Sequence, residues 1–294
     1  MPLVSVIMPC FNHARYVEES IKSVLNQTEG DLELIVVDDG SSDASIAVIE
    51  GVQATDNRLK TIYHEKNRGA SAARNSALKA ATGKYIAFCD ADDLWLPNKL
   101  AVQLETLAPY PEIGVTYCDT LIIDSEGKKT GKQFSDRFPV PGKGNGNLFH
   151  TLCIRNFINM QSALLRRAAI RSGDYFDPEI RWVEDWWFWV KIARTNNFIY
   201  NPEPLGFYRV HEASSANKQT VGLIQNRIKV YLRILDAFLD LPLRVVSAIY
   251  YHMGVGLTKS GNSREARDSY KRAFKFNPGN YKAAARFLLS YARS

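Results

Sequence analysis

The sequence predicts an α/β protein, in which a mainly parallel open sheet flanked by helices is followed by an all-α extension. Three observations point to this fold. Short apolar runs rich in β-branched residues alternate with helical patterns over the first ninety residues, acidic turns follow two of these runs, and apolar residues recur at helical spacing from about residue 221 onward. Parallel strands need crossover connections, which the intervening helices would supply.

The first part of the chain reads as repeated strand and helix pairs. Four strands are expected, at residues 3–8, 32–37, 59–63 and 85–89. The first strand precedes a helix with Val17 and Ile21 on its apolar face. The second precedes a helix capped by Ser42 or Asp43, and the third a helix over residues 70–81.

The pattern is weaker beyond residue 113. Strands are expected at residues 115–119 and 121–124, around a turn, and a helix, a strand and a second helix across residues 150–170. Residues 138–147 are rich in Gly and Pro, which predicts a mobile loop, and we expect the part at 142–146 to be a flexible loop on the acceptor side.

The C-terminal part differs in both pattern and charge, which places a domain boundary at residues 217 and 218. Residues 218–294 hold 14 Lys and Arg against 4 Asp and Glu, a net charge of +10, so residues 1–217 carry −4 of the total of +6. One apolar stripe is expected in the tail, and its members are Ile224, Ile228, Tyr231, Leu232 and Leu235.

Residues 248–281 of this tail resemble one tetratricopeptide repeat, with Gly254, Tyr270 and Pro278 at its small, aromatic and terminal proline positions. A single repeat needs neighbours to bury its faces. We therefore expect it to pack on the preceding helices or to pair with another chain, which leaves a homo-oligomer open.

Several function classes are excluded by composition. The four cysteines form no CxxC pair, and the N-terminal apolar run precedes its first basic residue, so we expect a reduced, cytoplasmic protein without a cleaved signal. The apolar stretch at 241–257 is interrupted by Arg244 and is too short to span a bilayer. Nucleic acid is not expected as a partner despite the pI near 9.0. The basic tail instead suggests peripheral attachment to anionic lipid at the inner face of the cell membrane.

Acidic residues follow the second and fourth expected strands. The set comprises Asp38, Asp39, Asp90, Asp92 and Asp93. The carboxyl ends of parallel strands share one edge of the sheet, where ligands bind in open α/β folds. Two carboxylates separated by one residue can hold Mg²⁺ or Mn²⁺ together with phosphate oxygens. The alternative interpretation is an ordinary helix cap.

Five segments give the sequence a recognisable resemblance. They are VSVIMPCFNHARYVEESIKSVLNQT, ELIVVDDGSSD, NRGASAARNSALKAATGKYIAFCDADDLW, WVEDWWFWVKIA and YRVHEAS. In order and spacing they resemble the family 2 inverting glycosyltransferases with the GT-A fold, over roughly residues 3–215. The resemblance implies an enzyme that moves a hexosyl or hexosaminyl group from a nucleoside diphosphate sugar to a saccharide or lipid-linked saccharide.

The resemblance also implies a donor site. Its expected nucleotide-sugar residues are Pro9, Asn12, Asp39, Gly69, Arg74, Asp90 and Ala91. A carboxylate at Asp39 could accept the N3–H of uracil or thymine, which favours UDP- or dTDP-linked donors. Asp92 and His211 match the positions that contact a divalent cation, Mn²⁺ or Mg²⁺. Asp93 is expected to brace the helix that follows it.

The resemblance places the general base at Asp185, with Glu184 as a supporting residue. An inverting transfer needs a carboxylate that takes the proton of the acceptor hydroxyl. Trp182, Trp186 and Trp189 share one face at helical spacing, which favours burial against the sheet. Trp187 lies off that stripe and is the expected acceptor contact.

Three other functions compete with this interpretation. A glycoside hydrolase also uses two carboxylates, but the adjacent Glu184 and Asp185 seldom flank one bond from opposite sides. A sugar nucleotidyltransferase would be expected to carry a Gly-rich segment after the first strand, where residues 9–12 read PCFN. A non-catalytic scaffold that binds partners through the helical tail remains open.

Overall fold

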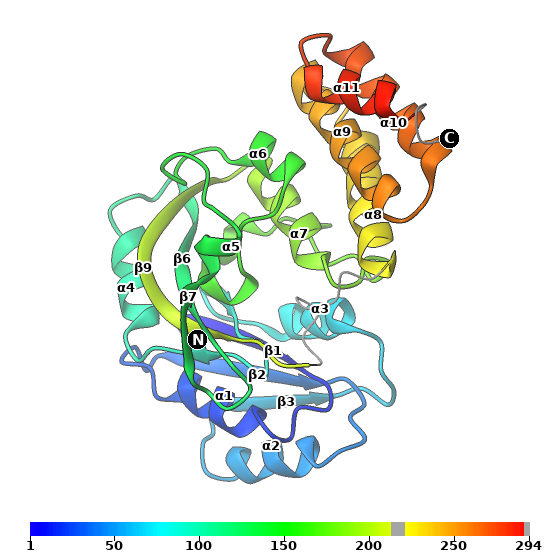
Figure 1. Cartoon of the computed structure of the whole chain (residues 1–294). Helices are drawn as coiled ribbons and strands as arrows, with labels where there is room; N and C mark the ends of the chain where they lie inside the picture. Colours follow the sequence, from blue (N-terminus) through cyan, green and yellow to red (C-terminus); the bar gives the residue numbers. More distant parts are fainter. Residues whose placement is uncertain (213–220, 291–294) are drawn as a thin grey trace. The chain divides into compact units, whose positions relative to one another are not determined.

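The computed structural model describes residues 1–212 and 221–290 (Figure 1). The chain forms two compact units. The first, here the sheet unit, comprises Met1–Leu148 and Phe157–Asn217, and the second, the helical unit, comprises Phe149–Asn156 and Lys218–Ser294. Residues 149–156 therefore belong with the C-terminal helices, although they lie far from them in the sequence.

Four parallel strands form the first half of the sheet unit. They are β1 (Val4–Cys10), β2 (Leu32–Asp38), β3 (Leu59–Tyr63) and β4 (Tyr85–Phe88), in the order β3-β2-β1-β4. Every residue of β2 is buried, as expected of a strand covered on both faces. The predicted strands are confirmed to within two residues at each end.

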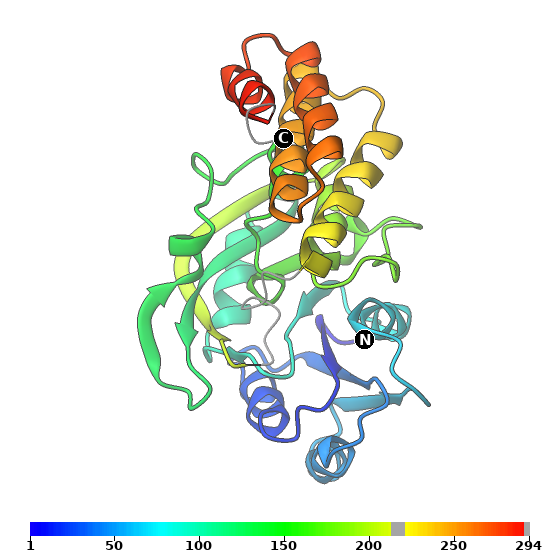
Figure 2. The ribbon, with the colours of Figure 1, turned by 45° about the vertical axis from the view of Figure 1, so that its right-hand side comes forward.

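Helices cover both faces of these strands. Helices α1 (Val17–Leu25) and α2 (Ser45–Gln53) lie on one face and α3 (Ala70–Ala80) on the other (Figure 2). Side chains alternate across a strand, so Val6 and Leu34 join the core cluster that contains Ile21 and Ile49. The loop at the carboxyl end of each strand is thereby held between a strand and a helix.

The second half of the sheet is mixed, not parallel. Its strands are β5 (Leu94–Trp95), β6 (Ile113–Ile123), β7 (Lys129–Gln133), β8 (Ala163–Arg166) and β9 (Asn197–Arg209). The order continues as β4-β8-β6-β9-β5, with β8 antiparallel to both its neighbours, β5 antiparallel to β9, and β6 parallel to β9. Helices α4 (Lys99–Leu107), α5 (Phe134–Arg137) and α7 (Glu184–Ala193) complete this half, with short 3₁₀ turns at Met160–Ser162 and Arg167–Ala169.

One sequence expectation in this half is wrong. Residues 115–119 and 121–124 do not form two strands around a turn, because β6 runs from Ile113 to Ile123. Residues 138–147 contain no helix or strand, and two contacts hold the segment at 142–146, which was expected to be a flexible loop. The hydroxyl of Tyr117 donates to the Gly144 carbonyl (2.9 Å), and Gly146 pairs with Phe198.

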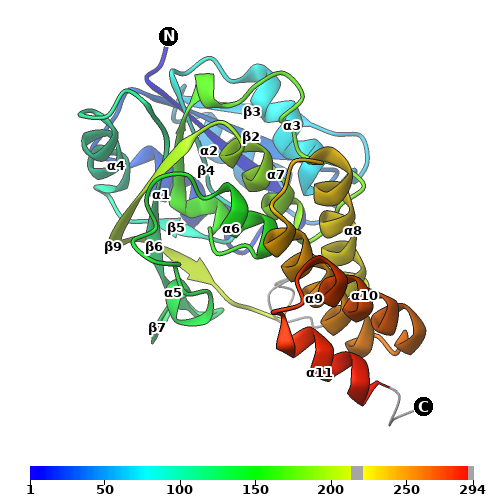
Figure 3. The same cartoon turned by 90° about the horizontal axis from the view of Figure 1, so that it is seen from above.

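The helical unit comprises α6 (Phe149–Ile154), α8 (Val221–Ala237), α9 (Leu243–Lys259), α10 (Ser263–Phe276) and α11 (Tyr281–Leu289). Helix α10 packs against both α9 and α11 (Figure 3). A Cβ added at Gly254 of α9 would lie 2.6 Å from the ring of Tyr270 in α10, so this close approach requires glycine. The Tyr231 hydroxyl of α8 donates to the Ile154 carbonyl of α6 (2.8 Å).

The expected stripe of α8 is wrong in part. Leu232 is half exposed, whereas Leu223, Val230 and Ile234 are buried, so the buried face of the helix is rotated from the predicted one. Among the described residues, no helix is both long and apolar enough to cross a membrane.

Candidate active site

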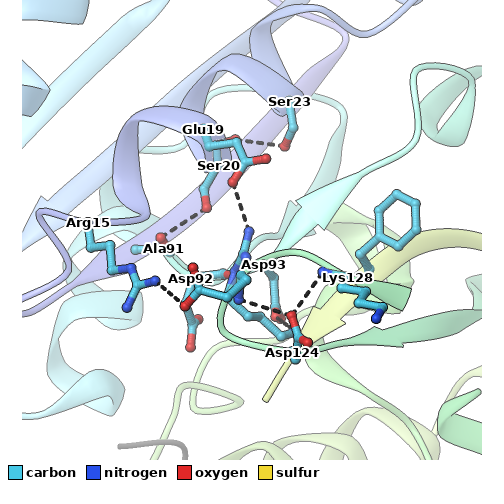
Figure 4. A network of polar contacts seen from close by, with 12 residues as sticks. Arg15, Glu19, Ser20, Ser23, Ala91, Asp92, Asp93, Asp124 and Lys128 are labelled. Carbon is cyan, nitrogen blue, oxygen red and sulfur yellow. Dashed lines mark hydrogen bonds and ion pairs between the residues drawn. The ribbon is translucent and has the colours of Figure 1, made fainter. Parts of the chain in front are cut away.

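The acidic turn at residues 90–93 follows β4 at the carboxyl edge of the parallel strands. Helix α1 fastens this turn from one side: the Ser20 hydroxyl donates to the Ala91 carbonyl (2.9 Å) (Figure 4). Ala91 itself is buried, so its side chain does not face an open site. Strand β9 fastens the turn from the other side through Arg209.

Arg209 joins three elements at this turn. Its guanidinium donates to the Asp92 carbonyl (2.8 Å) and to the Glu19 carboxylate of α1 (2.8 Å), and its backbone N–H donates to Asp93 (2.8 Å). Asp93 therefore anchors the end of β9 and does not brace the following helix, which corrects the sequence expectation. Its burial, with Asp92 and Asp90 nearby, raises the pKa of Asp93 well above its ordinary value.

The end of β9 brings His211 onto Asp92. The imidazole Nε2 lies 2.9 Å from Asp92 Oδ2. Burial opposes ionisation of Asp92, but this hydrogen bond and the nearby His13 hold the pKa of Asp92 below its ordinary value. The two expected metal ligands, 119 residues apart in sequence, are thus in direct contact.

A third group stands beside this pair. One ligand atom each from His13, Asp92 and His211 lie within 4.8 Å of one another. Ligands about 2.0–2.2 Å from one cation are at most about 4.4 Å apart, so small side-chain movements bring all three onto one ion. Nitrogen and carboxylate donors suit a first-row divalent metal, so this set fits the cation expected from the sequence. Sequence reasoning missed His13, although β1 and β4 adjoin in the sheet.

Arg74 links the acidic turn to the segment that carries Asp185. Its Nη1 donates to Glu184 Oε1 (2.6 Å) and its Nη2 to Asp90 Oδ1 (2.7 Å), and the residue is only 5% exposed. Burial opposes the charge, but the two carboxylates outweigh it and raise the pKa of Arg74. Both terminal nitrogens are used by the protein itself, so Arg74 has the geometry of a positioning residue.

Asp185 lies in the first turn of α7, immediately after Glu184, and is partly exposed. Burial of its carboxyl group raises the pKa of Asp185 to about 7, and Glu184 adds to the rise. Arg74 and the backbone N–H of Trp186, which donates to Asp185 Oδ1 (2.7 Å), oppose the rise. A carboxyl group with a pKa near neutrality suits a general base.

Tyr208 of β9 relates the two acidic groups to each other. Its burial raises its phenol pKa, and the charges of Asp93, Asp92, Asp90 and Asp185 raise it further. The carboxylates of the turn and of α7 therefore all lie near enough to Tyr208 to raise the pKa of its phenol. Sequence analysis gave no signal for Tyr208, because the residue reads as an ordinary strand tyrosine.

The tryptophans near Asp185 depart from the predicted helical stripe. Trp182 precedes α7 with a positive φ of 64° and is 48% exposed, so it does not share a helix face with Trp186 and Trp189. Those two are buried, as expected. Trp187, the predicted acceptor contact, is only 8% exposed, with the Lys191 ammonium 5.7 Å from its ring centroid. Trp182 presents the larger open ring.

Asp39, the carboxylate expected to bind the nucleobase, lies at the carboxyl end of β2. It is buried and accepts hydrogen bonds from the N–H of Arg68 (3.0 Å) and of Gly69 (2.7 Å), and its Oδ1 lies 2.6 Å from His64 Nδ1. These contacts occupy both oxygens, so Asp39 fixes the loop before α3. Gly69 has φ of 90°, and a Cβ added there would meet no atom of residues 1–212 or 221–290 within 4 Å, so the described residues leave space beside it. His64 is a second residue that sequence analysis missed.

The turn after β1 completes this edge. Asn12 has a positive φ of 56°, and its side-chain oxygen accepts the N–H of Ser42 (2.8 Å). The Ser41 hydroxyl accepts the N–H of Asn12 (2.9 Å). Pro9 stands in β1 opposite Val37 of β2. The residues expected to contact the nucleobase are therefore held at the neighbouring ends of β1 and β2.

Comparison with known proteins shows similarity to glycosyltransferases. The family described as "Glycosyl transferase family 2" matches residues 5–172. An Escherichia coli protein named UDP-Glc:alpha-D-GlcNAc-diphosphoundecaprenol beta-1,3-glucosyltransferase WfgD is 31% identical over 262 residues, which cover 87% of this chain and 94% of that protein. An uncharacterized glycosyltransferase of Rickettsia conorii is 33% identical over 225 residues, 75% of this chain, but only 36% of that longer protein.

Solved structures share the fold at low sequence identity. Staphylococcus aureus TarS residues 1–349 in complex with UDP-GlcNAc matches with a TM-score of 0.69 at 19% identity, over 99% of this chain and 89% of that one. A mannosyltransferase of Pyrobaculum calidifontis, PcManGT, in complex with GDP-Man and Mn²⁺, matches with a TM-score of 0.61 at 20% identity, over 99% of this chain and 80% of that one.

Proposed function

The chain belongs to glycosyltransferase family 2, and from this premise we propose that it is an inverting enzyme with a UDP- or dTDP-linked sugar as donor and a saccharide or lipid-linked saccharide as acceptor. The observation that carries the proposal is the double ion pair of Arg74. It ties Asp90 of the acidic turn to Glu184 beside Asp185, so that donor and acceptor chemistry can meet at one place.

Donor binding is assigned to the carboxyl edge of the parallel strands. Pro9 and Asn12 would contact the nucleobase. Asp39 would hold the backbone of Gly69, so that this backbone can approach the nucleotide. Direct contact of Asp39 with the nucleobase would add a fourth donor to the three that Asp39 already accepts, from His64, Arg68 and Gly69. The E. coli relative is named for UDP-Glc, and TarS was solved with UDP-GlcNAc, which supports a pyrimidine nucleotide.

Asp92 and His211 are proposed to hold the divalent cation, Mn²⁺ or Mg²⁺. Their contact places a carboxylate oxygen and an imidazole nitrogen on one side of the turn. When bound, the cation supplies positive charge that stabilises the departing diphosphate. PcManGT was solved with Mn²⁺, which supports a metal-dependent reaction here.

Asp185 is proposed to take the proton of the acceptor hydroxyl. That oxygen forms a bond to the anomeric carbon while the bond from this carbon to the diphosphate breaks, and the nucleoside diphosphate leaves with the electron pair. Attack from the face opposite the diphosphate inverts the anomeric configuration. Glu184, held by Arg74, would keep the first turn of α7 in place and raise the proton affinity of Asp185.

The proposed acceptor and location are supported by the relatives and by the charge of the tail. The E. coli relative is named for a lipid-linked saccharide acceptor, and residues 218–294 carry +10. We therefore infer a cytoplasmic enzyme that meets its acceptor at the inner face of the membrane, with residues 1–217 as the catalytic domain and 218–294 as an attachment domain. Flotation with acidic liposomes, with and without the tail, tests the attachment.

The tetratricopeptide-like interpretation of residues 248–281 is kept as part of this proposal. Two contacts between α9 and α10 support it. Gly254 packs closely against the ring of Tyr270, and the Ser247 hydroxyl donates a hydrogen bond to the Ala273 carbonyl (2.7 Å). A homo-oligomer formed through this pair is tested by light scattering of the full chain.

The alternative functions are not favoured. Family and relatives are named as glycosyltransferases, so neither a scaffold without activity nor a sugar nucleotidyltransferase is needed to explain the site. The deciding experiment is a panel of UDP- and dTDP-linked sugars, scored by released nucleotide with and without Mn²⁺. Release that needs both an acceptor and Mn²⁺ supports the proposal, whereas no release with any pyrimidine donor would overturn it.

A further inference from the structure

His13 lies in the middle of the loop between β1 and α1, and its backbone N–H and carbonyl are both hydrogen-bonded. Its N–H donates to the Ser45 hydroxyl (2.9 Å), and its carbonyl accepts the N–H groups of Tyr16 and Val17 (2.9 Å each) at the start of α1. The position of the imidazole is therefore set by the sheet and two helices.

The ring of His13 faces Asp92 and His211, the two proposed metal ligands. Among residues 1–212 and 221–290, this ring makes no hydrogen bond. It is partly buried and meets the His211 ring edge to face, with centroids 6.0 Å apart and planes at 88°. Tyr16 supports both rings, with its centroid 6.5 Å from that of His13 and 5.2 Å from that of His211. Two imidazoles are thus held together beside Asp92 by one aromatic side chain.

We propose that His13 is a third protein ligand of the donor's cation, so that this chain binds Mn²⁺ through two imidazoles and one carboxylate and discriminates against Mg²⁺. The inference rests on the proposed metal-dependent transfer and goes beyond it, because the pair of Asp92 and His211 alone leaves the choice of metal open.

The ligand atoms of His13, Asp92 and His211 determine which divalent cation binds more tightly. Mg²⁺ prefers oxygen ligands and loses its water reluctantly, whereas imidazole nitrogen favours first-row transition metals. Each imidazole in place of a water or carboxylate therefore raises the affinity for Mn²⁺ relative to Mg²⁺. With His13 included, nitrogen supplies two of three protein ligands.

The test uses the full chain and Mn²⁺ alone, then Mn²⁺ with UDP. Pulsed electron paramagnetic resonance of bound Mn²⁺ counts coordinated imidazole nitrogens, and the free Mn²⁺ signal gives the dissociation constant. We expect two nitrogens in the unaltered chain and one in His13→Asn, with Mn²⁺ affinity weakened about tenfold or more and Mg²⁺ affinity, measured by competition, changed much less. The matched control, His150→Asn in the helical unit, should leave both quantities unchanged.

Two outcomes would overturn the inference in different ways. A single nitrogen on bound Mn²⁺ in the unaltered chain, or unchanged Mn²⁺ affinity in a folded His13→Asn chain, removes His13 as a ligand and leaves the metal-dependent transfer intact. No Mn²⁺ binding by the unaltered chain, with or without UDP, removes the metal from the proposed function as well. The nitrogen count in the unaltered chain does not depend on whether the variant folds.

Discussion

Replacement of Asp185 by Asn tests the proposed base most directly. The variant keeps the size of the side chain but cannot take a proton from an acceptor hydroxyl. Loss of a general base costs about 10²–10⁴ in rate, which is about 3–5 kcal/mol of transition-state stabilisation. UDP binding should persist, because no expected nucleotide contact involves Asp185. Initial rates of nucleotide release and calorimetry with UDP measure the two properties separately.

The pH dependence of the unaltered enzyme should carry the signature of the same carboxyl. With the pKa of Asp185 at about 7, roughly a tenth of the molecules hold the active carboxylate at pH 6 and roughly nine tenths at pH 8. We expect kcat/KM to rise about tenfold between these two pH values. A profile that stays flat from pH 6 to 8, or an Asp185→Asn enzyme with the normal rate, would refute the assignment.

Stability gives an independent readout of this pKa. The folded-state pKa of Asp185 is raised above the ordinary value of 3.8, so the folded protein holds this proton more tightly than the unfolded chain. Its contribution to stability is therefore complete below about pH 4 and is lost as the pH rises through 7. We expect Asp185→Asn to melt above the unaltered protein at pH 8, with a smaller difference at pH 5.

Three further outcomes are expected. Asp92→Ala should abolish the Mn²⁺-dependent part of UDP binding in calorimetry, and binding insensitive to both the change and a chelator would contradict the metal assignment. Arg74→Met should lower the melting temperature, because the buried Glu184 and the partly exposed Asp90 would lose their partner, and breaking a buried ion pair costs about 3–5 kcal/mol. The same change should move the acidic limb of kcat/KM to higher pH, since Arg74 lowers the pKa of Asp185, and an unmoved limb would count against this coupling. Trp182→Ala should raise the acceptor KM without changing the donor KM, whereas Trp187→Phe should mainly lower the melting temperature. If Trp187→Phe raised the acceptor KM and Trp182→Ala did not, Trp187 would again be the acceptor contact.

The first half of the fold could be predicted because its signals are local. Each strand from β1 to β4 is a short apolar run that ends in a polar turn. The predicted cap of the second helix is wrong, because α2 has Ala44 as its N-cap residue, and the N-cap residues of α1, α2 and α3 make no side-chain cap hydrogen bond. The acidic residues at 38–39 and 90–93 could likewise be placed at one sheet edge, since parallel strands put their carboxyl ends together.

The second half could not be predicted, because long-range partners override local preference. Asp119 and Thr120 look like a turn within an apolar run, yet both lie inside β6. The Asp119 carboxylate is satisfied there by the N–H groups of Thr120 (2.8 Å) and Ser135 (3.2 Å), and by the Ser135 hydroxyl. An aspartate paired in this way is compatible with a strand interior, and only the folded chain supplies its partner.

The candidate site shows the same division. The residue types of the acidic turn and of Glu184 and Asp185 pointed to their chemistry, but the bridge by Arg74 joins residues up to 110 positions apart and leaves no periodic trace. His13 was hidden because a histidine in a turn has no pattern of its own. Trp182 was misplaced because α7 begins at Glu184, so helical spacing does not extend back to residue 182.

The hydrogen bonds of Arg209 limit which segments of this enzyme can be exchanged by engineering. The acidic turn, the first helix and the last strand meet at Arg209, whose guanidinium donates to Glu19 and Asp92 and whose backbone N–H donates to Asp93. A chimaera that imported a foreign segment at residues 90–93 would inherit its carboxylates but not their supports. Exchanging the acidic turn between such enzymes therefore requires exchanging all three pieces together.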